Sequence, residues 1–500
     1  MNEHASFYGQ PATLGSIPNL NSLFEPRSVA FIGASNNVFK WGFIILHHLV
    51  NRGFQGRVFP VNPQGGTWFG HEVYPDLDRI TEPIDLAVIV VKDTLVLDTV
   101  KKCIAKNIPF GIVITAGFSE TGSKGAELEK EIVNVARAGG MRLVGPNTMG
   151  VFSAYPSIMH ILMSGVPMQA GSVGMIAQSG NIGSSISYRF LRRKIGISRL
   201  ISSGNEGDLN TEDFLEYLGQ DSQTRIICLY VEGLRDGQRF FETARRISVN
   251  KPIILLKGGR TDKGAQAALS HTGAVATNDN IFNAMCRQAR IIQVETMDEM
   301  IDVAGILNAQ PLPGGNRVGI ITMGGGWGVI ATDMCIRNGL VVEPLEEHLL
   351  LKLDSILPKY WSRDNPIDLV APSRVEVITD SINILMEHTS IDTVLVMGLG
   401  YMILRAIGWK KSKFIPQELI HDPAESMISQ EMNLFRMVMD LIKKHGKPVI
   451  PVIDLMMFDM AIDNSPLDYL DSQGIMAYPC PESAVRALAK VVWYASARNC

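Results

Sequence analysis

The stretch from Ala267 to Ala276, AALSHTGAVA, contains the side chain best suited to nucleophilic chemistry. His271 lies between Ser270 and the pair Thr272 and Gly273. These small neighbours would let a bulky reactive group approach the imidazole closely. An imidazole that attacks through one nitrogen needs an acceptor for the other, because that hydrogen bond fixes the tautomer. The stretch alone leaves two interpretations open, a nucleophile or a histidine that caps a turn.

Glu232 is the candidate acceptor for that second ring nitrogen. It directly follows the apolar run from Ile226 to Val231, which is typical of a buried strand. A carboxylate at the end of a buried strand is costly unless it has a partner. We therefore expect Glu232 and His271 to lie together.

Three small-residue turns follow predicted strands and precede predicted helices, at Gly33, Ser179 and Gly324. Free backbone N–H groups and the positive end of the helix dipole make such a turn suitable for binding phosphate. For Ser179 an ordinary helix cap is the alternative. The candidate phosphate-binding residues are Ser179, Gly180, Asn181, Gly324, Gly325, Gly326 and Gly328.

The elements that must position these residues are strands that alternate with helices along the whole chain. This alternation predicts an α/β fold with doubly wound parallel sheets. A chain of 500 residues is too long for one core. We predict three Rossmann-like or flavodoxin-like domains over 1–153, with an N-terminal arm up to about Glu25, 154–309 and 316–500. A Pro/Gly-rich linker, 310–315, separates the last two.

The first turn argues against a nicotinamide dinucleotide. It reads Gly33-Ala34-Ser35 and lacks the GxGxxG pattern. The second predicted strand ends in Asn62-Pro63, where a nicotinamide enzyme usually carries an acidic residue for the ribose. A nicotinamide oxidoreductase is therefore the weaker interpretation of this domain.

Composition excludes several function classes. The formal net charge of −4 leaves no basic excess for a general nucleic-acid binder. No apolar run reaches the roughly 18 residues of a membrane span, and Met1 is not followed by a signal-peptide pattern. The 6 cysteines are scattered without CxxC pairs. We expect a cytoplasmic protein with reduced thiols, no metal site, no membrane partner and no nucleic-acid partner.

The segment 401–430 does not fit the alternating pattern. It is aromatic and basic at first, with the run Trp409 to Lys413. We predict a solvated loop there, in preference to a contact with a partner or substrate.

From about Ser28 to Ala495 the chain resembles the NDP-forming acyl-CoA synthetases. Within them it is most similar to the alpha subunit of ADP-forming acetate–CoA ligase, and more remotely to succinyl-CoA synthetase. The resemblance is carried by separated motifs in the same order, VAFIGAS from Val29, VNP from Val61, GPNTMG from Gly145, QSG from Gln178, YVEG from Tyr230, SHTGA from Ser270 and NPID from Asn365.

The resemblance implies that acyl-CoA, phosphate and ADP interconvert with free acid, CoA and ATP through a phosphohistidine. It gives His271 the phosphoryl group and Glu232 the role of holding the ring, while two helix N-termini stabilise the phosphoryl oxygens. It makes the first domain the CoA-binding domain and the other two ligase-type domains. The implied CoA-binding residues are Gly33, Ala34, Ser35, Lys40, Asn62, Pro63 and Asn147. Thr148 and Lys92 depart from the family pattern near the CoA groove.

The resemblance also implies a partner chain. Relatives bind ADP or ATP with Mg²⁺ on an ATP-grasp domain, which we do not find after Ala495. We therefore expect a heteromer with an ATP-grasp beta subunit. The alternative function is a non-catalytic CoA-binding sensor or scaffold, from which loss of the histidine would be expected. The sequence leaves open the acyl group, whether acetate, a branched acid or an aryl acid, and the choice between ADP and GDP.

Overall fold

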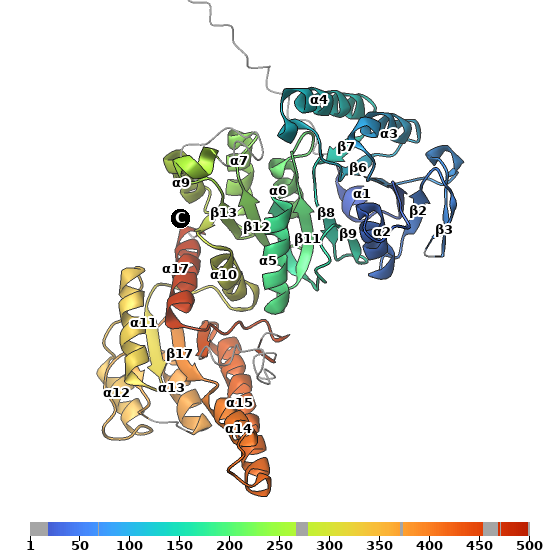
Figure 1. The fold of residues 1–500 in the computed structure, drawn as a ribbon. Helices are drawn as coiled ribbons and strands as arrows, with labels where there is room; N and C mark the ends of the chain where they lie inside the picture. The colour runs from blue at the N-terminus through green and yellow to red at the C-terminus, as the bar shows by residue number, and fades with distance from the viewer. Residues whose placement is uncertain are drawn as a thin grey trace, which may run out of the picture.

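The computed structural model describes residues 19–498, except 69, 267–278, 371–373, 454–468 and 471. Three sheets follow one another along the chain, coloured blue, green, and yellow to red in Figure 1, each with helices packed on it. All strands of the first and third sheets and most of the second run parallel, as the alternation of apolar strands and helices predicts. His271 lies outside the described residues.

The first sheet has the strand order β2-β1-β5-β6-β7. The order reverses between β1 and β5, so the carboxyl ends of these two strands flank a crevice suited to ligands. A small hairpin, β3 and β4, and a four-residue helix α1 complete this part. The bounds are α1 Asn21–Phe24, β1 Ser28–Ile32, α2 Trp41–Asn51, β2 Arg57–Val61, β3 Gly66–Trp68, β4 His71–Val73, η1 Leu77–Arg79, β5 Leu86–Ile89, α3 Asp93–Ala105, β6 Phe110–Val113, η2 Ser119–Thr121, α4 Ser123–Ala138 and β7 Arg142–Val144.

The second sheet has the order β14-β13-β12-β10-β11-β8-β9. The order in which the chain adds its five parallel strands reverses between β10 and β12. The crevice suited to ligands therefore lies between the carboxyl ends of these two strands. The bounds are β8 Gly150–Ser153, β9 Met159–Leu162, β10 Ala170–Ala177, α5 Gly180–Arg192, β11 Ile197–Ser202, α6 Thr211–Gln220, β12 Ile226–Val231, α7 Gly237–Ile247, β13 Ile253–Lys257, α9 Asp279–Gln288, β14 Ile292–Val294 and α10 Met297–Ala309.

The third sheet has the order β16-β15-β17-β18. Its crevice lies between β15 and β17 by the same rule. The bounds are β15 Val318–Thr322, α11 Gly325–Arg337, α12 Glu347–Asp354, β16 Ile367–Asp368, α13 Val375–Glu387, β17 Thr393–Leu399, α14 Tyr401–Lys410, α15 Gln417–His445, β18 Val449–Ile453 and α17 Pro481–Arg498.

Strand β8 belongs to the first predicted range, 1–153, yet it pairs antiparallel with β11 of the second sheet. Without β8, β11 would be an edge strand with a row of unpaired backbone groups. Strand β9 follows, pairs with β8 and contacts α2 of the first domain. The chain therefore ties the first two domains together at the boundary. The predicted domain ranges stay a prediction.

The end of the predicted N-terminal arm packs into the protein. Leu20, Leu23 and Phe24 are buried, and the Phe24 ring stacks on Tyr217 of α6 at 4.4 Å. Next to them the fully buried guanidinium of Arg199 forms ion pairs with Glu25 at 2.6 Å and Asp221 at 3.4 Å. Residues 19–25 therefore fasten the start of the chain to the second domain.

The second and third domains share one hydrophobic core. It joins residues of β10 such as Met175 to residues of β15 such as Ile320. Helices α10 and α17 lie between the two sheets, where α17 contacts both α10 and α11 (Figure 1). The final helix of the chain thus packs against both domains.

The predicted solvated loop over 401–430 is wrong. Helices α14 and α15 occupy most of this segment and pack on each other. The buried residues Ile420, Ala424, Glu431, Leu434 and Phe435 recur at helical spacing on α15. The basic run and the proline within α15 concealed this period. The Glu431 carboxylate accepts hydrogen bonds from the backbone N–H groups of residues 400 and 403 and thereby caps α14.

Replacing Arg199 with alanine should destabilise the fold. The substitution leaves Glu25 and the buried Asp221 without their cation, and breaking a buried pair in this way costs about 3–5 kcal/mol. Thermal unfolding followed by circular dichroism measures the change. The control is Arg27→Ala, whose partner is Asp85 and whose side chain is 90% exposed, so that about 0–1 kcal/mol is expected. Equal melting temperatures for the two variants would contradict this role of Arg199.

Candidate active site

The centre of the site is the crevice of the second sheet, where β10 and β12 end side by side. Gln178 directly follows β10, and Glu232 directly follows β12. Parallel pairing in register places Ala177 opposite Tyr230, so Gln178 and Glu232, one and two residues further on, lie at the same edge of the sheet. Each of the two strands is followed by a polar residue at its carboxyl end, and the strand order makes these two residues neighbours.

The Gln178 side chain is hydrogen-bonded to both the Glu232 loop and a second glutamate. Its Oε1 accepts the backbone N–H groups of Glu232 at 2.5 Å and Gly233 at 3.1 Å. Its Nε2 donates to the Gly233 carbonyl at 2.7 Å and to Glu206 Oε1 at 3.2 Å. Because the amide is buried and makes all these bonds, it fixes the backbone that carries Glu232.

The Glu232 side chain is 9% exposed and lies against residues of β12 and β13. The Tyr230 hydroxyl donates to its Oε1 at 3.2 Å, and Lys257 Nζ donates to its backbone carbonyl at 2.8 Å. A Cβ on Gly258 would lie 2.8 Å from the Tyr230 hydroxyl and 3.3 Å from Glu232 Cγ. Glycine at 258 therefore leaves the space that Glu232 occupies.

Burial shifts several protonation equilibria around this centre. Burial raises the pKa of Glu206, and hydrogen bonds from Thr211 and Gln178 oppose this shift. Burial and the neighbouring Glu206 charge raise the pKa of Glu212 to about 7, and burial lowers the pKa of Lys257. Glu206 and Glu212 therefore favour their neutral forms more than exposed carboxyls do.

The N-terminus of α5 begins directly beside this centre. Ser179 occupies the N-cap position but makes no side-chain capping hydrogen bond. A Cβ on Gly180 would lie 1.7 Å from Met149 Cγ, so only glycine lets the helix start so close to the loop that follows β7. Asn181 is exposed in the first turn. The predicted phosphate-binding residues of the second domain thus adjoin Glu232, and their ligand role stays a prediction.

The turn after β1 is compact and joins the end of β2. Gly33 has φ +95°, and a Cβ there would lie 2.1 Å from the Val90 carbonyl oxygen. Asn62 Nδ2 donates to the Ala34 carbonyl at 2.8 Å, while its Oδ1 accepts from the Gln64 N–H at 2.9 Å. Asn62 therefore shapes the turn, in the place where an acidic residue would bind a ribose.

The remaining predicted CoA-binding residues divide into two groups. Ser35 is buried and accepts the Asn37 N–H at 3.1 Å; Pro63 follows Asn62, and the exposed Lys40 is the N-cap residue of α2. Asn147 instead follows β7, at the opposite side of the sheet from β2. Its amide donates to Asn205 Oδ1 of the second domain at 3.1 Å. Asn147 thus joins the two domains rather than the β1 turn.

In the third domain, the predicted glycines form the start of α11. Gly324 is its N-cap residue without a side-chain cap, and Gly325, Gly326 and Gly328 lie in the first turn. A cavity of about 370 Å³ is lined by residues of this turn and by Asp368. A Cβ on Gly325 would lie 3.1 Å from Asp368 Oδ2. Helix α5 contacts α10, α10 contacts α17, and α17 contacts α11; that α5 and α11 converge on one phosphoryl group stays a prediction.

Sequence reasoning gave no role to Gln178, Glu206, Lys257 or Met149, although their neighbours were singled out. For Gln178 and Lys257 a signal existed, because both stand at the carboxyl ends of predicted strands. For Glu206 and Met149 none did, since each gains its position from a contact between segments far apart in sequence.

The comparisons with known proteins agree with this arrangement. A "CoA binding domain" family matches residues 27–154, and a "Succinyl-CoA ligase like flavodoxin domain" family matches residues 170–307. The chain is 34% identical over 476 residues to the ADP-forming acetate–CoA ligase I subunit alpha of Pyrococcus furiosus, covering 94% of this chain and 96% of that protein. It is 37% identical over 379 residues to the subunit alpha of the second such ligase of that organism, covering 76% and 82%.

This chain belongs to the family of ADP-forming acyl-CoA ligases. A solved structure of a dinucleotide-forming acetyl-coenzyme A synthetase 1 from Ca. Korarchaeum cryptofilum, in complex with phosphate and ADP, has a TM-score of 0.83 and 31% identity to it. The match covers 96% of this chain and 98% of that one. The predicted family resemblance, the α/β fold class and the enzyme class, an acid–thiol ligase, are confirmed.

Membership of the ADP-forming acyl-CoA ligase family distinguishes between the functions and ligands predicted from the sequence. CoA, phosphate and ADP or ATP are the reactants of ADP-forming acyl-CoA ligases, so the alternative as a nicotinamide oxidoreductase is not supported. The relatives from Pyrococcus furiosus are named as alpha subunits, which implies a second subunit for this type of chain. Within the described residues, no helix is both long enough and apolar enough to cross a membrane.

Replacing Gln178 with glutamate should destabilise the protein although it preserves shape. The new oxygen would face the Gly233 carbonyl and Glu206 Oε1 in place of a donor. Losing these bonds inside the protein should lower the free energy of unfolding by about 2–3 kcal/mol. This destabilisation should become smaller as the pH falls, because the new carboxyl becomes protonated and can donate again. Thermal unfolding at several pH values measures this.

The matched control is Gln220→Glu, which also replaces a donor that faces a glutamate, Glu216 Oε1 at 2.9 Å. Because residue 220 is exposed, water can solvate the new charge and a small effect is expected. If both variants unfold at the temperature of the unmodified protein, Gln178 does not hold the site as described.

Proposed function

We propose that this chain is the catalytic alpha subunit of an ADP-forming acyl-CoA ligase and that His271 carries the phosphoryl group. The overall reaction converts acyl-CoA, phosphate and ADP into carboxylic acid, CoA and ATP. The observation that carries the proposal is the buried Glu232 at the crevice between β10 and β12, whose backbone N–H donates to Gln178 and whose carboxylate accepts from Tyr230. Strand β13 ends beside it, and His271 follows later in the sequence, outside the described residues.

The proposed chemistry has two steps on this chain. In the first, a phosphate oxygen attacks the thioester carbonyl, the C–S bond breaks, and CoA leaves as the thiolate while an acyl phosphate forms. In the second, a nitrogen of His271 attacks phosphorus, the P–O bond to the acyl group breaks, and the carboxylate leaves. Glu232 accepts a hydrogen bond from the N–H of the other ring nitrogen and so keeps the attacking nitrogen unprotonated.

The helix N-termini supply the electrostatic part of the proposal. Ser179, Gly180 and Asn181 begin α5 beside Glu232, and their backbone N–H groups would stabilise the phosphoryl oxygens. Gly325 to Gly328 would do the same from α11, whereas the Gly324 N–H already donates to Thr322 Oγ1 at 3.1 Å. Neither helix has a side-chain cap at its N-terminus, so a side chain of the N-cap residue does not compete for these donors.

CoA would bind to the first domain. The compact Gly33 turn brings the backbone of Gly33, Ala34 and Ser35 to the crevice between β1 and β5, and Lys40 adds a positive charge at the start of α2. Asn62 and Pro63 shape the turn, and Asn147 would place the reacting end of CoA near the second domain. The contact of Met149 with Gly180 supports this geometry, because it joins the two domains at the phosphate-binding helix.

The partner would be an ATP-grasp subunit that binds ADP or ATP with Mg²⁺. A longer relative, the ADP-forming acetate–CoA ligase II of Archaeoglobus fulgidus, is matched over 97% of this chain but 68% of its own length, so that relative has a further part that this chain does not match. We also infer a cytoplasmic location. It is supported by the 5 described cysteines, which form no disulfide.

The decisive experiment incubates the chain with acetyl-CoA and labelled inorganic phosphate. We expect acid-labile label on the unmodified protein and none on His271→Asn. Glu232→Gln should reduce the rate of labelling about 10²-fold, because the ring loses its charged orienting partner. The control His421→Asn, an exposed position on α15, should label normally. CoA binding without any label, with a panel of acyl-CoA thioesters, would instead indicate a sensor or scaffold.

Complete turnover tests the partner. The chain mixed with an ATP-grasp beta subunit of the family should form ATP from acyl-CoA, phosphate and ADP, while either chain alone should not. A luminescence assay for ATP measures this. ATP formation by the purified chain alone would contradict the division of the reaction between two subunits.

A further inference from the structure

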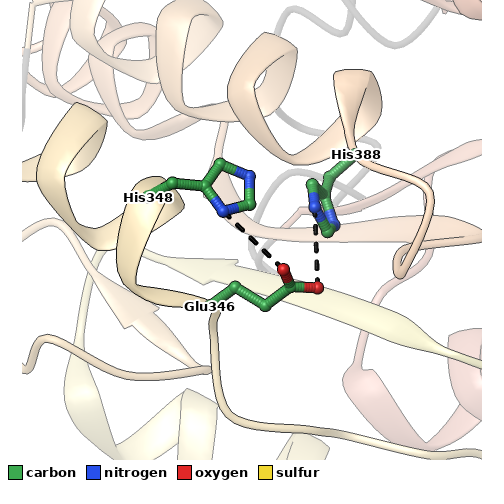
Figure 2. A group of neighbouring side chains, drawn as sticks. All are labelled: Glu346, His348 and His388. Atoms are coloured by element: carbon green, nitrogen blue, oxygen red, sulfur yellow. Dashed lines mark ion pairs between the residues drawn. The ribbon is translucent and has the colours of Figure 1, made fainter.

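A group of two histidines and one glutamate gathers in the third domain, away from the proposed active site. Glu346 is the N-cap residue of α12, His348 lies in its first turn, and His388 follows the last residue of α13. Figure 2 shows the two imidazole rings facing the Glu346 carboxylate from two sides. The sequence predicts no metal site, because the two histidines are far apart along the chain and no short motif joins them.

The spacing of the ligand atoms is too long for hydrogen bonds but suits a shared ion. His348 Nδ1 is 3.7 Å from Glu346 Oε2, and His388 Nε2 is 3.6 Å from Glu346 Oε1. One ligand atom from each residue lies within 4.8 Å of the other two. Ligands bound tetrahedrally at about 2.0–2.1 Å from Zn²⁺ are separated by about 3.3 Å. Small side-chain adjustments would therefore bring the three into coordination.

The backbone that carries these side chains is already fixed. The Glu346 carbonyl accepts N–H groups of the first turn of α12, and the buried Leu349 and Leu353 pack that helix in the core it shares with α13. The His388 N–H donates to the Leu385 carbonyl at 3.2 Å, and its carbonyl accepts from Lys447 Nζ at 2.5 Å. An ion would thus bind between two anchored helix ends at little conformational cost.

His388 also has a partner for its second ring nitrogen. Its Nδ1 accepts a hydrogen bond from the Ser390 backbone N–H at 3.2 Å and lies 2.5 Å from Ser390 Oγ. In this geometry Nδ1 accepts the Ser390 N–H, so a metal on Nε2 would require the ring proton to move to Nδ1; the Ser390 hydroxyl would then accept it in place of that contact. The side chain of His388 is 16% exposed, whereas His348 and Glu346 are 51% and 55% exposed. One side of the group is therefore open to an entering ion and to water.

The position of the group indicates a structural role. Val341, shortly before Glu346, bridges to Arg317 just before β15, and His388 precedes the start of β17. The group thus lies towards the amino ends of these strands, whereas the glycine turn of α11 and Asp368 lie at the carboxyl ends. We propose that Glu346, His348 and His388 bind one divalent transition-metal ion of the Zn²⁺ class, which ties α12 to α13, with water completing the coordination.

Zinc titration of the full chain tests the site, after treatment with EDTA and its removal. Isothermal titration calorimetry should show that the unmodified protein binds one equivalent of Zn²⁺. The double variant His348→Ala/His388→Ala should not bind it, and Glu346→Gln should bind it at least tenfold more weakly. Ser390→Ala should weaken binding about tenfold by removing the acceptor of Nδ1. The neighbouring Glu347→Gln, which alters the same helix turn outside the group, should bind like the unmodified protein.

Thermal unfolding provides a second readout. Added Zn²⁺ should raise the melting temperature of the unmodified protein but not that of the double variant, and both should melt alike in EDTA. Mg²⁺ should have no such effect, because it prefers oxygen ligands. The proposal is overturned if the double variant binds Zn²⁺ with unchanged stoichiometry and affinity, or if Zn²⁺ leaves the melting temperature of the unmodified protein unchanged.

Discussion

The geometry of the proposed active site depends on the burial of one amide, Gln178, in the crevice where the strand order of the second sheet reverses. The reversal leaves room between the ends of β10 and β12, and buried polar backbone groups there need partners. Gln178 supplies both an acceptor for the Glu232 loop and a donor for Gly233 and Glu206. A single side chain thereby provides hydrogen-bond partners for the polar groups of the crevice. It also fixes the loop that carries the carboxylate on which the proposed phosphoryl transfer relies.

The first two domains meet around this crevice through close backbone approach. Gly180 lets α5 begin against Met149, and the Asn147 amide donates to Asn205 across the boundary. Strand β8 adds a further link, because the chain leaves the first domain through it and its backbone pairs with β11 of the second sheet. These contacts bring the carboxyl ends of two separate sheets to one region, which is the arrangement needed if a reactant held by one domain is to react on the other.

The third domain is joined differently. It shares a hydrophobic core with the second through α10 and α17, so the two sheets are linked by helix packing rather than by a polar crevice. Its own polar features are separated by the sheet. The α11 turn and Asp368 lie at the carboxyl edge, while Glu346, His348 and His388 lie towards the amino edge. The carboxyl edge is suited to a ligand that reacts, and the amino edge to an ion that cross-links.

Sequence alone determined the parallel α/β class, most strand positions and the candidate turns, because apolar runs, glycines and helix starts are local patterns. It also placed Glu232 at a strand end. It failed at 401–430, where a basic run and prolines hid the apolar stripe of α15. Only the tertiary structure decided which strand ends are neighbours. The role of Gln178, the fit of Gly180 to Met149 and the meeting of His348 with His388 arise from strand order and helix packing between distant segments, and local residue patterns do not encode those distances.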